Sequence, residues 1–330
     1  MINLRDYDYG LPEGMIAQKS HRPRDGCRLM IIKDKILHKK FSDVLDFLHD
    51  GDVLVLNNTR VMKMKIYGKK STGSDAEIVL TRKLYANTYE CHIKTRNPHA
   101  GTVIELSKGK AMIIKQKDID TYIIKIAGHS RRYMPGPPYI KKKMTSEYQT
   151  VYAKLPGSLA SPTAGLHFTN NLLKKIRDKG VKIAHITLHI GYGTFRNIDD
   201  IKSYRTEKEC FEITRKASET INKRKGRLFV AGTTTLKALE SSSRDGKIIP
   251  KKSSSRLFIK PGHRFSCGAD ALITNFHLPK SSLLLLTCAF GGRKRVLDAY
   301  QKAIEKKYRF YSLGDAMIIY KFRLQKKIYK

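Results

Sequence analysis

Two histidines stand in loops bounded by glycine or proline, where an imidazole is expected to be exposed rather than packed. His167 lies in residues 162–168 (PTAGLHF), and His277 lies in residues 274–279 (TNFHLP). The imidazole group titrates near neutral pH, so either side chain can give or take a proton during a reaction. We therefore treat these two loops as the first candidates for chemistry.

Other polar loops follow apolar runs, and each has a purely structural explanation beside the functional one. The sequence after residue 56 reads Asn57-Asn58-Thr59-Arg60, which is either a ligand-binding loop or a turn with a solvated charge. His189 is either a ligand contact or a core histidine, and Gly191 and Gly193 serve a tight turn equally well. The threonines 233–235 can bind a ligand or cap a helix. Asp315, next to Gly314, can be a functional carboxylate or a turn residue.

Several enzyme signatures are absent from the sequence. There is no G-x-G-x-x-G after a strand, no P-loop, no H-E-x-x-H and no G-x-S-x-G. The cysteines at 27, 91, 210, 267 and 288 form no C-x-x-C pair. This spacing argues against a disulfide scaffold and a structural zinc site, and it is typical of a reducing cytosol. Residues and spacing alone indicate a basic two-domain α/β enzyme without defining its reaction.

The elements that must position these loops alternate between strand and helix. Apolar runs at 52–56, 181–188, 228–231 and 271–274 predict buried strands. Helices are predicted from a Thr169 cap to Gly180, over 236–241, from a Ser281 or Ser282 cap through 283–290, and over 296–306. Such alternation favours a mostly parallel sheet, and loops that follow its strands are where open α/β sheets bind ligands.

Residues 61–126 have a different character. Short β-favouring runs occur at 62–67, 77–80, 88–94, 102–106, 112–113 and 122–126, separated by breaks at 68–73, 97–101 and 108–110. This spacing predicts a small antiparallel barrel or a meander, and the segment ends at a proline-rich stretch, 134–139, which is interpreted as a hinge or domain junction. The expected organisation is 1–60 as the first part of a larger α/β domain, 61–149 as an inserted β-barrel domain, and 150–330 as the remainder of the α/β domain.

Composition limits the kind of partner. The 330 residues hold 65 Lys and Arg against 29 Asp and Glu, so the formal net charge is +36. A polyanion such as nucleic acid is the first partner to test, although drift of the composition toward lysine explains the charge equally well. With 41% hydrophobic residues the chain is expected to be globular. Residues 1–8 have no apolar core and the run 283–290 is too short to span a membrane, so a cytoplasmic protein is expected.

Taken together, the motifs are specific for one family. They run in order through nearly the whole chain: 11–13 (LPE), 16–18 (IAQ), 24–25, 28–29, 51–52, 58–61 (NTRV), 137–140 (PPYI), 148–153 (YQTVYA), 162–168 (PTAGLHF), 193–195 (GTF), 232–234 (GTT), 270–279 (DALITNFHLP) and 314–317 (GDAM). This pattern closely resembles the S-adenosylmethionine:tRNA ribosyltransferase-isomerases of queuosine biosynthesis.

The resemblance implies a reaction. These enzymes move the ribosyl moiety of S-adenosylmethionine onto 7-aminomethyl-7-deazaguanine at the tRNA wobble position and isomerise it, giving epoxyqueuosine, adenine and methionine. The sulfonium acidifies the adjacent sugar C–H, so that a base can begin the reaction. S-adenosylmethionine is a consumed co-substrate, and neither a resident cofactor nor a metal is expected. The expected partners are S-adenosylmethionine and tRNA carrying that base, bound by a monomer.

The resemblance also suggests residue roles. We predict His167 and His277 as acid/base residues, with Asp270 and Asp315 as further catalytic residues that orient them. Ribose or adenine is expected to be bound by Thr163, Thr233, Thr234, Glu240 and Asn275. Anticodon phosphates are assigned to Arg60, and stacking on an unpaired base is assigned to Tyr139 or Phe168.

The chain departs from the family pattern at several positions. It reads Met62-Lys63-Met64-Lys65 where Ile-Pro-Ala-Arg is usual, and Gly136 where leucine is usual. Tyr204 and Glu207 fall in a stretch that usually carries two histidines before a glutamate, here Glu209, and Lys237 replaces an arginine. Two alternatives stay open: a tRNA-binding relict with weakened or lost chemistry, and an enzyme that uses another acceptor.

Overall fold

The computed structural model describes residues 2–118, 120–195, 198 and 200–322, and the chain divides into two compact units. Unit 1 comprises Met1–Arg60 and Glu147–Lys330, and unit 2 comprises Val61–Ser146. The barrel domain was expected to start at residue 61, which is where unit 2 begins. Its expected end at residue 149 lies slightly beyond Ser146, so Tyr148 is a residue of unit 1.

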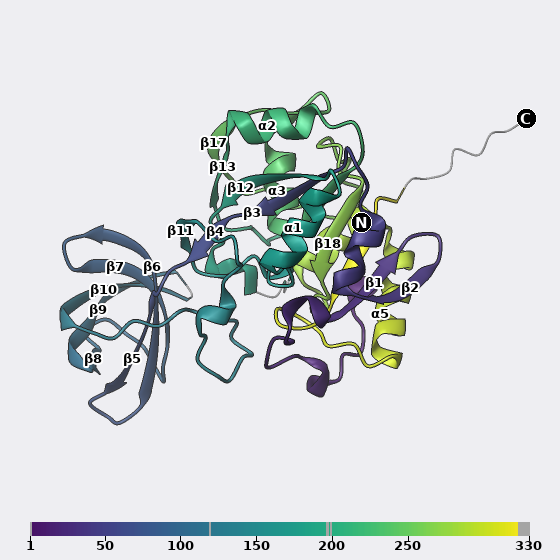
Figure 1. Cartoon of the computed structure of the whole chain (residues 1–330). Coiled ribbons are helices and arrows are strands. Elements are labelled where there is room, and N and C mark those ends of the chain that lie inside the picture. Colours follow the sequence, from purple (N-terminus) through teal and green to yellow (C-terminus); the bar gives the residue numbers. More distant parts are fainter. Residues whose placement is uncertain (1, 119, 196–197, 199, 323–330) are drawn as a thin grey trace, which may run out of the picture. The chain divides into compact units, whose positions relative to one another are not determined.

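Unit 1 is built on a sheet that has nine strands among the described residues (Figure 1). In spatial order they are β17 (Lys251–Ser255), β13 (Glu209–Ile213), β12 (Lys182–Leu188), β3 (Val53–Asn57), β14 (Leu228–Ala231), β18 (Ala271–Asn275), β19 (Ala316–Tyr320), β1 (Arg28–Ile32) and β2 (Ile36–Lys40).

The sheet is mixed: its centre is parallel, and its margins are antiparallel except for the parallel pair of β19 and β1. β12, β3, β14 and β18 run parallel, whereas β18 pairs antiparallel with β19, and β13, β17 and β2 are also antiparallel to their neighbours. The α/β class and its inserted barrel are confirmed. The expectation of a mostly parallel sheet is met only in part, because the sheet is mixed: β1 also pairs parallel with β19, but the remaining neighbours outside the centre are antiparallel.

Both faces of the sheet are covered, as the continuous apolar strands predicted. Val53 and Val55 of β3 join the core on one face, while Leu54 and Leu56 join the core on the other. The first face packs against α2, α3, α4 and α5, and the second packs against α1 and a 3₁₀ helix at Phe41–Phe47 (Figure 1). The helices are α1 (Asn170–Asp178), α2 (Arg215–Asn222), α3 (Thr233–Ser241), α4 (Ser282–Gly291) and α5 (Arg293–Glu305).

The helix starts follow the capping residues in the sequence. The hydroxyl of Thr169 accepts a hydrogen bond from the Leu172 N–H at 3.1 Å, and the hydroxyl of Ser281 accepts one from the Leu284 N–H at 3.2 Å. Gly180, with φ at +84°, follows the end of α1 as predicted. These two caps fix the ends of the segments that carry the candidate loops 162–168 and 274–279.

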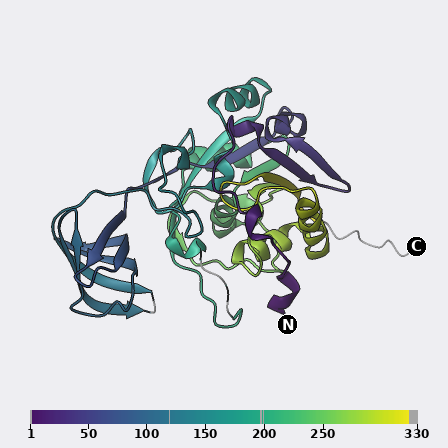
Figure 2. The same ribbon diagram turned by 90° about the horizontal axis from the view of Figure 1, so that it is seen from below.

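Unit 2 is a closed antiparallel barrel (Figure 2, blue strands). Its strands, in order around the barrel, are β10 (Thr121–His129), β7 (Thr88–Lys94), β6 (Asp75–Tyr85), β5 (Lys65–Lys70), β8 (Val103–Leu106) and β9 (Lys108–Asp118). Residues 108–110 were expected to form a break, but they belong to β9, where Gly109 lies opposite Gly128. A side chain at Gly109 would meet the Ala127 carbonyl at 2.1 Å, so this glycine permits a close approach rather than a loop.

Short elements complete the described chain: β4 (Thr59–Val61), β11 (Leu155–Ser158), β15 (Ser243–Arg244), β16 (Lys247–Ile248), and 3₁₀ turns at Leu4–Tyr7, Glu13–Met15, Arg24–Gly26, Ser146–Tyr148, Thr163–Gly165 and Tyr192–Phe195. None of the helices in the described residues has the length and apolar character needed to cross a membrane.

Candidate active site

The polar loops gather at one edge of the unit 1 sheet. β12, β14 and β18 are parallel members of that sheet, so the loops that follow them emerge at the same edge. β19 runs antiparallel to β18, so the segment that precedes β19 reaches this edge as well. Four segments that are far apart in the sequence therefore lie at the same edge of the sheet, which is where open α/β sheets bind ligands.

A cavity lies among these loops, with an empty volume, open solvent at its mouth included, of about 510 Å³. Five residues predicted from the sequence line it: Thr163, Thr233, Thr234, Asn275 and His277. The other lining residues are Tyr148, Ala160, Ser161, Pro162, Ala164, Ile190, Thr194, Phe195, Gly232, Thr274, Leu283, Tyr311 and Ser312. The structure therefore brings together most of the residues expected to bind ribose or adenine.

The charge of the cavity differs from that of the whole chain. Among the described residues that line it there is no Lys, Arg, Asp or Glu, although the chain carries a net charge of +36. Its wall instead combines hydroxyl, amide and imidazole groups with aliphatic and aromatic side chains, the aromatic ones including Tyr148, Phe195 and Tyr311. Such a wall does not repel a cation, and aromatic rings attract one.

The first turn of α3 forms one side of the cavity. Gly232, at the N-cap position, has φ at +97°, a conformation that L-residues rarely adopt, and it offers no side chain to cap the helix. Thr235 donates its hydroxyl to the Ala231 carbonyl at 2.6 Å, and of the three threonines in this turn it is Thr233 and Thr234 that line the cavity. The first N–H groups of a helix are suited to polar or anionic ligand groups.

His277 is buried in the wall of the cavity, with 5% of its surface exposed. Its Nε2 lies 3.1 Å from the Thr274 hydroxyl, and its backbone N–H donates to the Tyr300 hydroxyl at 3.0 Å. The Tyr9 hydroxyl donates to the His277 carbonyl. Burial lowers the pKa of this imidazole to about 3, so it is neutral near pH 7. The expectation that this histidine is exposed is wrong, because its loop packs inward over the aromatic core.

Two buried polar atoms of the cavity wall have no hydrogen-bond partner in the described chain. They are the hydroxyl of Ser161 and the Oδ1 of Asn275. Burial also raises the pKa of the Tyr148 phenol, so it stays protonated. Buried polar groups are nearly always paired in folded proteins. The wall therefore presents donors and acceptors that a polar ligand can satisfy.

His167 does not line this cavity. It is 5% exposed and lies between the Sγ of Cys27 and the Nδ2 of Asn275, each 3.1 Å from a ring nitrogen. Burial, with a smaller contribution from the Arg309 guanidinium, lowers its pKa to about 3. The expectation of an exposed imidazole is wrong here too, because the ring packs against Phe41 at 5.0 Å between centroids. Its link to the cavity is indirect, through Asn275.

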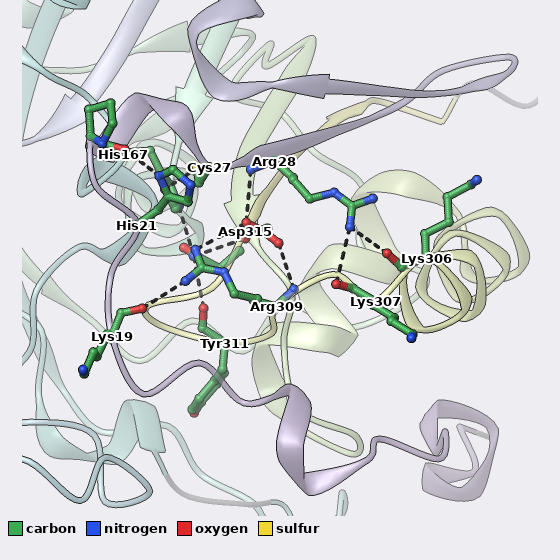
Figure 3. A network of polar contacts seen from close by, with 12 residues as sticks. Lys19, His21, Cys27, Arg28, His167, Lys306, Lys307, Arg309, Tyr311 and Asp315 are labelled. Atoms are coloured by element: carbon green, nitrogen blue, oxygen red, sulfur yellow. Dashed lines mark hydrogen bonds and ion pairs between the residues drawn. The ribbon is translucent and has the colours of Figure 1, made fainter.

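Asp315 acts on the backbone around the site rather than on a histidine ring. Its carboxylate accepts hydrogen bonds from the backbone N–H groups of Arg28 and Arg309 at 3.1 and 2.8 Å, and the Arg309 guanidinium lies 3.5 Å away. Figure 3 shows Arg309 reaching from Asp315 to the carbonyl of Lys19. The carboxylate thus fixes the turn that contains Tyr311.

Asp270 is remote from the cavity. It precedes β18, whereas the cavity residues follow the other end of that strand, and its Oδ2 accepts a hydrogen bond from the Leu228 N–H at 2.9 Å. This contact aligns the starts of β14 and β18. The predicted role for Asp270 in orienting a histidine is not met, because the strand separates the two ends.

Glu240 is also turned away from the cavity. Its carboxylate accepts hydrogen bonds from the backbone N–H groups of Ser266 and Cys267 at 2.9 and 3.0 Å, and the His263 Nε2 lies 3.0 Å away. These contacts lower the pKa of the carboxyl group despite its burial. The expected ribose contact is wrong, because both oxygens are occupied by the segment 263–267.

The three residues predicted to bind nucleic acid lie in different surroundings. Arg60 is exposed at the end of unit 1, and Tyr139 is half-buried in unit 2, so the roles of both stay predictions. Phe168 is fully buried and packs edge-to-face on Phe41 at 5.0 Å. Its predicted stacking on a base is wrong, because the ring belongs to the core below the sheet.

The structure adds cavity residues to which the sequence analysis gave no role: Tyr148, Ser161, Thr194, Phe195, Tyr311 and Ser312. Tyr148, Thr194 and Phe195 lie within motifs of the resemblance, and that was the available signal. Tyr311 and Ser312 fall just before the GDAM motif. Their proximity depends on the β18–β19 pairing, which no local pattern indicates.

The departures from the family pattern are accommodated locally. Lys237 of α3 pairs with the buried Glu209 of β13 at 2.6 Å, so the lysine at this position has a carboxylate partner. Glu207 lies against Gly191 and Gly193, where any added side chain would meet it within 2.7 Å. Tyr204 packs on Phe258 at 5.1 Å between centroids. The substituted residues thus have structural partners, and none of them lines the cavity.

No group of three or more His, Cys, Asp or Glu side chains that could hold a metal ion occurs in the described part of the chain.

The fold and the site together define an α/β enzyme with an inserted β-barrel and a cavity at the C-terminal edge of its central strands, whose described lining carries no charged residue. Residues 4–319 match the family model described as queuosine biosynthesis protein. The chain therefore belongs to the queuosine biosynthesis protein family, which confirms the resemblance drawn from the motifs.

Individual relatives agree with this assignment. The S-adenosylmethionine:tRNA ribosyltransferase-isomerase of Desulforamulus reducens is 43% identical, over 96% of this chain and 100% of the relative. The enzyme of the same description from Fusobacterium nucleatum is 42% identical, over 96% of this chain and 97% of the relative. A crystal structure of S-adenosylmethionine tRNA ribosyltransferase from Thermotoga maritima has 31% sequence identity and a TM-score of 0.55, covering 95% of this chain and 99% of that one.

Proposed function

We propose that this chain is an S-adenosylmethionine:tRNA ribosyltransferase-isomerase that uses the cavity of unit 1 to bind S-adenosylmethionine. Its relatives of 42–43% identity carry this description over their whole length, which favours an active enzyme over a tRNA-binding relict. The observation that carries the proposal within the structure is the cavity itself. Its described lining is uncharged and combines hydroxyl, amide and imidazole groups with apolar and aromatic side chains, many of them from the motifs, which suits a nucleoside with a sulfonium cation.

His277 is the acid/base residue of this proposal. Among the described residues that line the cavity it is the one imidazole, and none of them is a carboxylate. Burial keeps this imidazole neutral. When Nε2–H donates to the Thr274 hydroxyl, Nδ1 carries the lone pair that takes the proton acidified by the sulfonium on the adjacent sugar carbon. The imidazolium that forms is a strong acid, which suits return of the proton to the departing adenine.

The acceptor is the aminomethyl group of 7-aminomethyl-7-deazaguanine at the tRNA wobble position, and the product is epoxyqueuosine. S-adenosylmethionine is consumed as a substrate, and we propose no resident cofactor. Because tRNA is the second substrate and the five cysteines are all free, we place the reaction in the cytoplasm, and we propose that the enzyme acts as a monomer.

The test is an assay of both products. The protein is incubated with S-adenosylmethionine and tRNA that carries 7-aminomethyl-7-deazaguanine, and nucleosides and free adenine are measured by mass spectrometry. Epoxyqueuosine with an equal amount of adenine is expected. His277→Ala is expected to lower kcat by about 100-fold or more, the usual contribution of an acid/base residue. His49→Ala, at an exposed position of unit 1, is the matched control.

Other results would replace the proposal. A folded protein that binds this tRNA without forming either product would be a tRNA-binding relict. Release of adenine without epoxyqueuosine would indicate another acceptor. Normal turnover by His277→Ala would remove His277 from the chemistry while leaving the enzymatic assignment intact.

A further inference from the structure

The amide of Asn275 has a single allowed orientation. Its Nδ2 lies 3.1 Å from the Tyr311 carbonyl and 3.5 Å from the Asp315 carbonyl, and 3.1 Å from the Nε2 of His167. Backbone carbonyls can only accept hydrogen bonds. The NH₂ end of the amide must therefore face them, because a flipped amide would place two acceptors in contact.

His167 is held in one tautomer by the same contact. Asn275 donates to Nε2, so the proton of the neutral ring sits on Nδ1, where it is directed at the Sγ of Cys27 at 3.1 Å. A protonated ring could not accept from Asn275, and burial keeps His167 neutral. In Figure 3, His167 lies beside Cys27. The ring has no nitrogen left for a substrate.

The carbonyl end of the Asn275 amide is the part that can contact a ligand. Asn275 is 2% exposed and lines the cavity, and its Oδ1 has no hydrogen-bond partner in the described chain. The turn that orients the amide is itself held by Asp315, through the N–H groups of Arg28 and Arg309. A buried acceptor without a partner is costly to leave unsatisfied. The fixed amide thus presents an acceptor to whatever occupies the cavity.

We propose that His167 is a positioning residue, which orients the amide of Asn275 so that Oδ1 accepts a hydrogen bond from bound S-adenosylmethionine. The proposal rests on the proposed function for its ligand. It replaces the acid/base role expected for His167. The donor on the ligand is an N–H or O–H group, supplied either by the adenosine part or by the ammonium group of the methionine part.

A double-mutant cycle tests this relation. Dissociation constants for S-adenosylmethionine are measured by calorimetry for the wild type, Asn275→Ala, His167→Ala and the double variant, with His49→Ala as the control. Asn275→Ala is expected to weaken binding about tenfold, the typical effect of one hydrogen bond. His167→Ala is expected to weaken it several-fold, and the double variant should bind no worse than Asn275→Ala. His167→Gln, whose side-chain oxygen can accept from Asn275, is expected to restore most of the affinity.

Two readouts separate positioning from a merely structural role. Ring ¹⁵N–¹H NMR of histidine-labelled protein should show His167 as the Nδ1–H tautomer. In turnover, His167→Ala should raise KM for S-adenosylmethionine far more than it lowers kcat. An Nε2–H tautomer, or effects of His167→Ala and Asn275→Ala that multiply in the double variant, would overturn the proposal. So would a loss confined to kcat.

Binding of adenosine and of methionine, measured separately, shows which part of S-adenosylmethionine donates the hydrogen bond to Asn275. If Asn275→Ala weakens binding of adenosine and not of methionine, the adenosine part supplies the donor, and the reverse result assigns it to the ammonium group. If the wild type binds S-adenosylmethionine and both variants bind it equally well, this proposal fails while the proposed function stands. If the wild type does not bind S-adenosylmethionine at all, the proposed function fails, and the ligand named here fails with it.

Discussion

His167 and His277 are neutral imidazoles in the interior of unit 1, and burial lowers the pKa of each to about 3. In the unfolded chain a histidine titrates near 6.5. Between these two values the unfolded chain binds a proton that the folded chain does not, so the free energy of unfolding decreases as the pH falls through this range. The stabilisation is present above pH 6.5 and is lost progressively toward pH 3.

The expected size of this effect can be measured. Between pH 7 and pH 5 each imidazole is expected to reduce the free energy of unfolding by about 2 kcal/mol. Urea unfolding at both pH values should therefore give a smaller decrease for His167→Gln and for His277→Gln, each by about that amount. His49→Gln, at an exposed position, should retain the wild-type decrease. An unchanged decrease in the two interior variants would show that these rings titrate normally.

At the scale of elements, α3 is tied to its neighbours through two carboxylates. Glu209 of β13 pairs with Lys237 on the helix, and Glu240 near the end of the helix holds the segment 263–267. The second contact places no ligand-binding group in the cavity. The hydrogen bonds to Ser266 and Cys267 explain why the charged Glu240 is buried. They also fix the end of α3, the helix whose first turn forms part of the cavity wall.

Glu240→Gln is therefore expected to reduce stability rather than substrate binding. Both oxygens of the Glu240 carboxylate accept hydrogen bonds, whereas the amide of glutamine has only one oxygen and places an NH₂ group against a donor. The free energy of unfolding should therefore decrease by about 2–3 kcal/mol. The dissociation constant for S-adenosylmethionine should change by less than about twofold. Glu219→Gln, which removes an exposed i,i+4 pair with Lys223, should change stability by less than about 0.5 kcal/mol. If Glu240→Gln instead weakens the binding of S-adenosylmethionine and leaves the stability unchanged, Glu240 is a ligand-binding residue.

At the scale of the whole molecule, the net charge of +36 and the uncharged cavity separate two kinds of binding. Contacts between lysine or arginine and phosphates release counterions, so the affinity for RNA falls steeply with salt. A ligand held in a cavity without charged lining residues has no such dependence.

Binding of the two substrates at 50 and 200 mM salt is the corresponding measurement. The affinity for a tRNA anticodon stem-loop is expected to fall by about tenfold or more, whereas the affinity for S-adenosylmethionine should change by less than about twofold. Arg60→Ala should make the salt dependence for RNA shallower, and Arg244→Ala, another exposed arginine of unit 1, should leave it unchanged. A flat response for RNA would mean that compositional drift toward lysine, and not RNA binding, explains the charge.

The sequence by itself determined the family, the α/β class with its inserted barrel, and five residues of the cavity wall. It could do so because motifs, caps and strand periodicity are local: Thr169 caps α1 whatever surrounds it, and the loop at Gly232 follows a strand that is apolar throughout. The sequence did not show which segments come together in the cavity wall. That depends on the pairing of β18 with β14 and with β19, which are far apart in the chain.

Only the tertiary structure decided which polar side chains face the cavity. His167 and Asp270 lie within motifs and Glu240 lies on the helix that follows one, yet each is bonded elsewhere, and the motif residue Phe168 packs in the core. A motif shows that a residue type is required at a position, but the direction of its side chain is set by partners remote in sequence. Asn275 illustrates the difference, because its identity is local whereas the orientation of its amide comes from His167 and from a turn near residue 311.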